Sequence, residues 1–203
     1  MKKIIMITAV LLSMAAAAAQ TAHRTALDKL CDALSSSCVT MQCSYQMFVS
    51  QTRVTGEAEV SVQGDSYKMS GNGLQVYCDG VKVWTVDPTT KEVYVESVGD
   101  MAVNSLANPA ALFMHLGASF DVVSSSQSGG MFSYKLAPRI NCGVVSADLV
   151  LVQDGKPVSA VFVLEDGLKV DVTVKSMSMG KIKPEDEFRP QVSFGSDWIV
   201  TEL

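Results

Sequence analysis

Apolar and polar residues alternate along most of the chain from residue 39 onward. Val39, Met41, Cys43, Tyr45 and Met47 alternate with polar residues, which is the pattern of a strand with one buried face. Similar runs cover residues 57–63, 67–69, 74–78, 81–86, 93–98, 120–124, 131–137, 142–153, 157–164 and 168–179. The pattern therefore predicts an antiparallel sheet of about ten to eleven strands.

Short polar segments separate these runs and predict hairpin turns. Asp79-Gly80, Asp154-Gly155 and Asp166-Gly167 each lie between two apolar runs. Asp-Gly favours the two left-handed positions of a tight type I′ turn, and we expect Asp79 and Gly80 to occupy them. Residues 124–130 are polar and rich in serine and glycine, which predicts a loop.

Two segments have helical periodicity. Leu27, Leu30, Cys31 and Leu34 follow the i, i+3, i+4, i+7 spacing within residues 21–37, so an amphipathic helix is predicted there. Residues 100–117 are also apolar and are interrupted by Asn108-Pro109, where Asn can cap a helix and Pro can begin one. The second piece would present the apolar side chains of Leu112, Phe113 and Leu116. This cluster must be covered by another part of the protein.

The elements together indicate a mainly β fold of the α+β class. A helix before the strands and a helical insert among them favour one strongly curved antiparallel sheet. Residues 1–19 combine Lys2-Lys3, an apolar stretch and a run of alanines, as in a secretory signal peptide cleaved after Ala19. A membrane-spanning helix is disfavoured because the apolar stretch is shorter than the roughly 20 residues that span a bilayer. We expect residues 20–203 to form one domain in an exported protein.

Charge and cysteine usage narrow the function. The formal net charge is −5, and removing Lys2 and Lys3 with the leader makes it −7. An acidic domain repels phosphates, which argues against a nucleic acid partner. The five cysteines are an odd number, so at least one thiol cannot pair within the chain. They are interpreted mainly as small apolar wall residues.

No catalytic pattern is evident. The two histidines, His23 and His115, stand apart, and no zinc-binding, nucleophile-elbow or phosphate-loop motif occurs. Glu185, Asp186 and Glu187 form a charged run that is typical of a solvated turn. We therefore predict that the protein is not an enzyme and has no catalytic residue, no cofactor and no metal site.

Three short motifs, in order, carry a resemblance to a known family. They are Gly56-Glu57, then Asp79-Gly80-x-x-x-Trp84-x-x-Asp87-Pro88, then Asn108-Pro109 followed by apolar residues. This order resembles that of the periplasmic carriers of outer-membrane lipoproteins, the LolA type, and covers nearly the whole processed chain. The resemblance implies an unclosed β-barrel whose concave side is covered by a helical lid.

The resemblance also implies a function. A carrier of this type binds the acyl chains of lipoproteins in an apolar cleft and moves them, as a monomer in the periplasm, from an inner-membrane release complex to an outer-membrane receptor. Eight methionines follow the leader, and methionine adapts to ligands of irregular shape, although the same residues could simply fill a core. The side chains expected to line the cleft are Met41, Tyr45, Met47, Val60, Met69, Trp84, Val93, Val95, Phe162 and Val172, with Leu112, Phe113 and Leu116 in the lid.

One departure from the family leaves other functions open. The carriers often have an Arg-Pro pair in the strand after the Gly-Glu motif, and its arginine latches the lid. Residues 62–68 contain neither arginine nor proline, and Lys68 is a poor substitute for a planar guanidinium. The alternatives are a lipid- or lipoprotein-sensing module that acts through a protein partner, and a hydrolase, which would need a clustered acid, base and nucleophile.

Overall fold

The structure is a computed structural model that describes residues 26–49, 52–98, 113, 116–139 and 144–203. The predicted leader (residues 1–19), Asn108-Pro109, Leu112 and Cys142 lie outside the described residues.

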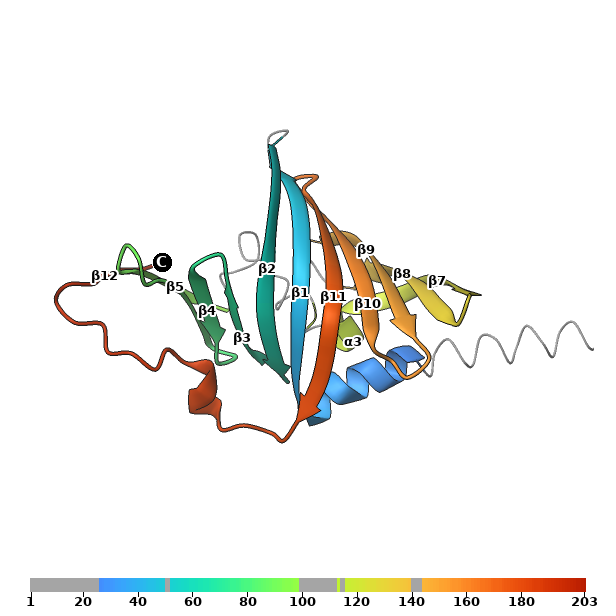
Figure 1. The fold of residues 1–203 in the computed structure, drawn as a ribbon, viewed down its shortest axis with the longest axis horizontal. Helices are drawn as coiled ribbons and strands as arrows, with labels where there is room; N and C mark the ends of the chain where they lie inside the picture. The colour runs from blue at the N-terminus through green and yellow to red at the C-terminus, as the bar shows by residue number, and fades with distance from the viewer. Residues whose placement is uncertain (1–25, 50–51, 99–112, 114–115, 140–143) are drawn as a thin grey trace, which may run out of the picture.

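One twelve-stranded sheet, in the order β12-β6-β5-β4-β3-β2-β1-β11-β10-β9-β8-β7, organises the fold (Figure 1). Every neighbouring pair is antiparallel except β12 and β6, which are parallel. The strands are β1 (Cys38–Val49), β2 (Thr52–Gln63), β3 (Ser66–Gly71), β4 (Leu74–Cys78), β5 (Lys82–Asp87), β6 (Glu92–Ser97), β7 (Phe120–Ser128), β8 (Met131–Pro138), β9 (Val144–Val152), β10 (Pro157–Leu164), β11 (Lys169–Gly180) and β12 (Ile199–Glu202).

The mainly β, antiparallel architecture with an N-terminal helix is confirmed, whereas the predicted degree of curvature is wrong. The sheet is open and is not strongly curled. Alternation determines which side chains share a face, but it does not determine how far a sheet bends, which depends on bulges and twist. The additional strand, β12, lies in a tail whose polar and apolar residues show no regular alternation.

Most of the predicted lid, residues 100–112, 114 and 115, lies outside the described residues. In the described part of the chain, residues 26–36, Phe113 and α3 (Leu116–Ser119) are helical, and η2 (Glu185–Phe188) is a 3-10 turn. No helical lid is seen among these residues. Of the three lid residues, Phe113 and Leu116 are described.

The two faces of the sheet differ in chemistry over its central strands. We call the face that carries Met41 face A and the opposite face, which carries Gln42, face B. Register connects Met41 with Val60, Val60 with Met69 and Met69 with Val76, so these four side chains share face A. Face A carries a continuous buried cluster that extends from Val83 of β5 to Phe120 of β7.

The helix at residues 26–36 packs on this cluster. Ala26, Leu30 and Leu34 are buried and Leu27 is partly buried, so the predicted apolar stripe is confirmed. The backbone N–H of Gly64 donates to the carbonyl oxygen of Leu34 at 3.1 Å. This bond joins the end of the helix to the turn between β2 and β3.

The turns are only partly as predicted. Gly80, Gly155 and Gly167 have positive φ values, but none of the aspartates that precede them does, so the type I′ prediction for Asp79-Gly80 is wrong. Asn72 and Gly73 have φ values of 52° and 83° and fill the two-residue loop between β3 and β4, as a type I′ turn requires.

The predicted loop at residues 124–130 is also wrong, because β7 continues to Ser128. Its partners on β8 extend to Met131, which pairs with Ser128. Pairing with a neighbouring strand can outweigh the low strand propensity of a polar sequence.

Gly155 allows the β9–β10 turn to touch the helix. Its N–H donates to the carbonyl of Val152 at 2.9 Å, and its φ is +87°, as in a type I turn with a bulged glycine. A Cβ at this position would lie 2.8 Å from the Cβ of Lys29 and 2.9 Å from the carbonyl oxygen of Ala26. Both the conformation and the lack of space therefore require glycine here.

Gly155→Ala should destabilise the protein more than Gly167→Ala. Both positions are left-handed, with φ values of +87° and +82°, but a Cβ at Gly167 meets nothing within 4 Å. Gly167→Ala should cost about 1–2 kcal/mol from conformation alone, and Gly155→Ala should cost a further ~1–3 kcal/mol because it overpacks against the helix. Urea denaturation measures both free energies of unfolding. Equal losses would contradict the docking of the helix on this turn.

Candidate functional site

Seven of the ten residues predicted to line a cleft come together on face A. Met41, Val60, Phe162 and Val172 are members of its buried cluster, and Tyr45, Met47 and Met69 pack against it while partly buried. They come from β1, β2, β3, β10 and β11. The partly buried members mark the edge of a well-packed apolar surface.

Phe113 is one of two described residues of the predicted lid that reach this surface. Its side chain is 0% exposed, as is that of Phe162. The two rings meet edge to face, with centroids 6.3 Å apart and an interplanar angle of 83°, a favourable aromatic geometry. Leu116 of α3 is buried in the same cluster, so two predicted lid residues cover part of face A.

The other three predicted lining residues, Trp84, Val93 and Val95, lie on face B. Trp84 pairs with Tyr77 and Val95, whereas Val76, which is on face A, pairs with Thr85. Trp84, Val93 and Val95 belong to a second cluster, which packs against Phe194 and Trp198 of the C-terminal tail. The structure thus separates them from the face A residues.

The buried side changes within β5. Val83 and Val86 are both buried, and residues three apart on a strand point to opposite faces. Alternation does not mark this change in the sequence, because Val83 and Trp84 are adjacent and both apolar.

Gly56, of the Gly-Glu motif, has a packing role. It pairs with Tyr45 across β1 and β2, and a Cβ on it would lie 2.5 Å from the hydroxyl oxygen of Tyr45 and 2.4 Å from Nδ2 of Asn72. Asn72 Nδ2 donates to that hydroxyl at 2.6 Å. The aromatic ring thus covers a glycine on a neighbouring strand, which stabilises such positions in sheets.

The two aspartates of the longer motif organise turns. Asp79 Oδ1 accepts hydrogen bonds from the N–H groups of Val81 and Lys82, both at 2.9 Å. Asp79 Oδ2 accepts one from Arg189 Nε at 2.7 Å. Asp87 Oδ1 accepts hydrogen bonds from the N–H groups of Thr89 and Thr90. The motif residues therefore build the scaffold and do not line the apolar surface of face A.

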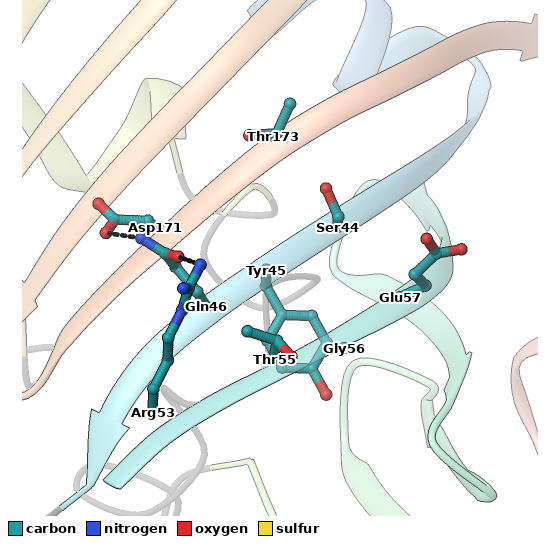
Figure 2. A pocket seen from close by; sticks show the side chains of 9 residues that line it. All are labelled: Ser44, Tyr45, Gln46, Arg53, Thr55, Gly56, Glu57, Asp171 and Thr173. Carbon is teal, nitrogen blue, oxygen red and sulfur yellow. Dashed lines mark hydrogen bonds between the residues drawn. The ribbon is translucent and has the colours of Figure 1, made fainter. Parts of the chain in front are cut away.

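A polar hollow of about 420 Å³ lies where β1, β2 and β11 run side by side (Figure 2). Its lining is mostly the face B side chains of these strands: Ser44, Tyr45, Gln46, Arg53, Thr55, Gly56, Glu57, Asp171 and Thr173. Sequence reasoning missed this hollow, because every half-exposed strand carries alternating polar residues and nothing in the pattern marks these as special.

Within the hollow, Asp171 is held in its charged form. Burial alone would raise the pKa of Asp171, but hydrogen bonds from Gln46 and Lys169 and the charge of Lys169 lower it below its ordinary value. Gln46 Nε2 donates to Asp171 Oδ2 at 3.0 Å, and Lys169 Nζ lies 3.0 Å from Asp171 Oδ1.

Four described cysteines, Cys31, Cys38, Cys43 and Cys78, are free. Burial raises the pKa of both Cys43 and Cys78 to about 11, so the thiols of these two residues are protonated near neutral pH. The described residues also contain no cluster of histidine, cysteine, aspartate and glutamate that could hold a metal ion. No described helix has the length and apolar character needed to cross a membrane.

Comparisons with known proteins give similarities of fold. No family model matches the sequence, and no curated protein matches it. Among solved structures, the chain is similar to a DUF1329 family protein from Desulfovibrio piger (8% identity, 84% of this chain and 97% of that one, TM-score 0.49). It is also similar to a LolA superfamily protein from Nitrosomonas europaea (12% identity, 82% and 97%, TM-score 0.46).

A third similar structure is a domain from Vibrio parahaemolyticus described as a putative outer membrane lipoprotein-sorting protein (12% identity, 84% of this chain and 97% of that one, TM-score 0.49). Identities this low do not assign a ligand or an activity.

Asp79→Asn should make the protein less stable at neutral pH and less sensitive to acid. The Asp79 side chain is 5% exposed. Burial would raise its pKa, but hydrogen bonds from Lys82, Val81 and Arg189 lower it below the ordinary 3.8. Its stabilising contribution is therefore complete above that value and is lost as the pH falls through the lower pKa of the folded state.

We expect a loss of about 1–2 kcal/mol at pH 7, measured by urea denaturation. The difference between wild type and variant should shrink on acidification below pH 3.8. Arg189→Gln, which keeps the two backbone hydrogen bonds to Asp79, should cost about 1 kcal/mol or less, because Arg189 is half exposed. A pH-independent difference for Asp79→Asn would contradict the charged role of this carboxylate.

Proposed function

We propose that the protein is a periplasmic carrier that binds the acyl chains of lipoproteins against face A and moves them from the inner to the outer membrane without chemistry. The observation that carries the proposal is the fully buried contact of Phe113 with Phe162. Phe113 belongs to the segment between β6 and α3, where the LolA-type pattern of the sequence predicts a lid. In this proposal its ring occupies the place that an acyl chain takes when cargo binds.

The energetics of acyl burial fit a reversible carrier. Each CH₂ group that leaves water contributes about 0.8 kcal/mol. A chain of about sixteen carbons would therefore gain on the order of 10 kcal/mol, from which ordering and association costs are subtracted. The remainder is enough for a complex in water, and a receptor that offers an equally apolar surface can compete for the cargo.

The lid works as a two-state element in this proposal. In the closed state Phe113 and Leu116 cover face A, and in the open state the acyl chains replace them, together with the predicted lid residue Leu112. Cargo then shifts the population toward the open state because it binds only there. Met41, Tyr45, Met47 and Met69 would adapt to chains of different shape.

The periplasmic location and the partners rest on the leader and on the family resemblance. The N-terminal nineteen residues have the pattern of a secretory signal. We propose an inner-membrane release complex as donor and an outer-membrane receptor as acceptor. The carrier itself acts as a monomer. A sensing module that binds the same cargo and signals through a protein partner is distinguished by stable binding to an inner-membrane regulator.

Replacing Phe113 and replacing Phe162 should have opposite effects on cargo affinity. Phe113→Ala removes a contact made only in the closed state, so a diacylated lipopeptide should bind more tightly, by about ten-fold. Phe162→Ala removes part of the binding surface and should weaken binding. Both variants should lose roughly 3 kcal/mol of unfolding free energy, as usual for large-to-small changes in a core. Displacement of an apolar fluorescent probe measures affinity, and denaturation measures stability.

The equal stability losses make the two variants matched controls for each other. Mass spectrometry of wild-type protein, purified gently from the periplasm, should detect bound acylated proteins. The proposal is wrong if Phe113→Ala weakens lipopeptide binding as much as Phe162→Ala does, because Phe113 would then be part of the binding surface and not its cover.

A further inference from the structure

The end of the β1–β2 hairpin bears a second, chemically different surface. β1 and β2 extend beyond most of the sheet (Figure 1), and the polar hollow lies near the end of their pairing (Figure 2). This surface is on face B, because Gln46 pairs with Thr55 and Ser44 pairs with Glu57, all on the face opposite Met41. Apart from Tyr45, which lines the hollow and also packs against the face A cluster, it is separate from the apolar surface proposed for acyl chains.

Arg53 contributes a positive charge to the rim of the hollow. Its Nη2 donates to Gln46 Oε1 at 2.6 Å, and Gln46 in turn donates to Asp171. Asp171 is paired with Lys169, and Glu57 is paired with Lys175. The hollow itself is lined by one cation, Arg53, and two carboxylates, Asp171 and Glu57, whose lysine partners lie outside the lining. Within the described part of the chain Arg53 has no carboxylate partner, so it is the cation of this surface that is left for a ligand. The protein as a whole is acidic.

The floor of the hollow offers hydroxyl groups. Ser44 lies directly opposite Thr173 on β11, and Thr55 lies opposite Gln46 on β1. All three line the hollow, and their hydroxyls make no hydrogen bond with another described residue. A guanidinium can bond an oxyanion with two parallel donors, and adjacent hydroxyls can donate to its remaining oxygens.

An exposed aromatic ring completes the surface. Phe48 pairs with Arg53 across the hairpin, so both side chains lie on face B, and Phe48 is 52% exposed. Aromatic side chains beside basic ones are characteristic of protein surfaces that meet the boundary between lipid head groups and acyl chains. A free phosphate would have no use for Phe48, whereas a lipid head group would contact both residues.

We propose that this end of the hairpin binds the phosphate of an anionic phospholipid at a membrane surface. Arg53 pairs with the phosphate, the hydroxyls of Ser44, Thr55 and Thr173 bond its remaining oxygens, and Phe48 enters the head-group boundary. This proposed site is additional to the carrier function and lies on face B, opposite the surface proposed for acyl chains. It adds a means by which a water-soluble protein is held at a bilayer.

Co-sedimentation with vesicles tests this site. The full mature chain should bind vesicles rich in phosphatidylglycerol and should bind vesicles of phosphatidylcholine alone much less. Arg53→Ala should reduce the partition coefficient about five-fold, because that is the factor by which one basic residue strengthens binding near an anionic membrane. Phe48→Ser should reduce it about ten-fold through loss of apolar burial. Circular dichroism should show both variants folded, since both side chains are exposed.

Arg139→Ala is the matched control for charge. Arg139 is half exposed and loses the same charge on replacement, but it is paired with Asp121. It follows β8 (Met131–Pro138), which β11, β10 and β9 separate from β1. It should leave vesicle binding within about two-fold of wild type.

Three results would overturn the proposal. One is an equal loss for Arg139→Ala and Arg53→Ala, which would indicate a response to net charge. The second is binding that does not depend on phosphatidylglycerol. The third is Arg53-dependent binding of glycerol 3-phosphate without binding to vesicles, which would indicate a site for a free phosphate ester. Lipopeptide affinity, measured on the same variants, should stay unchanged, so the outcome is independent of the carrier function.

Discussion

The need to bury one face of a single-layered sheet governs this structure. Face A carries apolar side chains from β1 to β5 and from β7 to β11, and no second sheet covers it within the described residues. The helix at residues 26–36 covers part of it, and Phe113 and Leu116 cover another part. The proposed carrier function requires that this cover be exchanged for acyl chains.

The motif residues that suggested the family act through folding. Gly56 leaves room for the ring of Tyr45, Asp79 joins a turn to Arg189 of the C-terminal tail, and Asp87 closes another turn. Asp79 and Asp87 act in turns, and Gly56 meets face A only through the ring of Tyr45. A short motif can therefore identify a scaffold through its turns and close contacts, while the binding surface consists of apolar residues that many sequences could supply.

The two faces also divide the proposed functions. Face A is apolar and is proposed to bind acyl chains. Face B at β1, β2 and β11 is polar and hydroxyl-rich, and it carries Arg53, which has no carboxylate partner among the described residues. Farther along the sheet, face B becomes apolar and is closed by Phe194 and Trp198 of the tail. The tail thus removes from water an apolar patch that would otherwise expose Val86, Val93 and Val95.

The sequence by itself determined the local structure: the strands, the helix near the N-terminus and the glycines at the turns follow from side-chain alternation and backbone conformation, which act between near neighbours. The tertiary structure alone decided three other features. β7 extends through a serine-rich segment because β8 supplies its hydrogen bonds. Trp84, Val93 and Val95 join the tail instead of Met41 because the buried side changes between Val83 and Val86. The hollow around Arg53 forms because register places β11 beside the β1–β2 hairpin, from which it is distant in sequence, and pairing between distant strands depends on contacts that a local pattern does not contain.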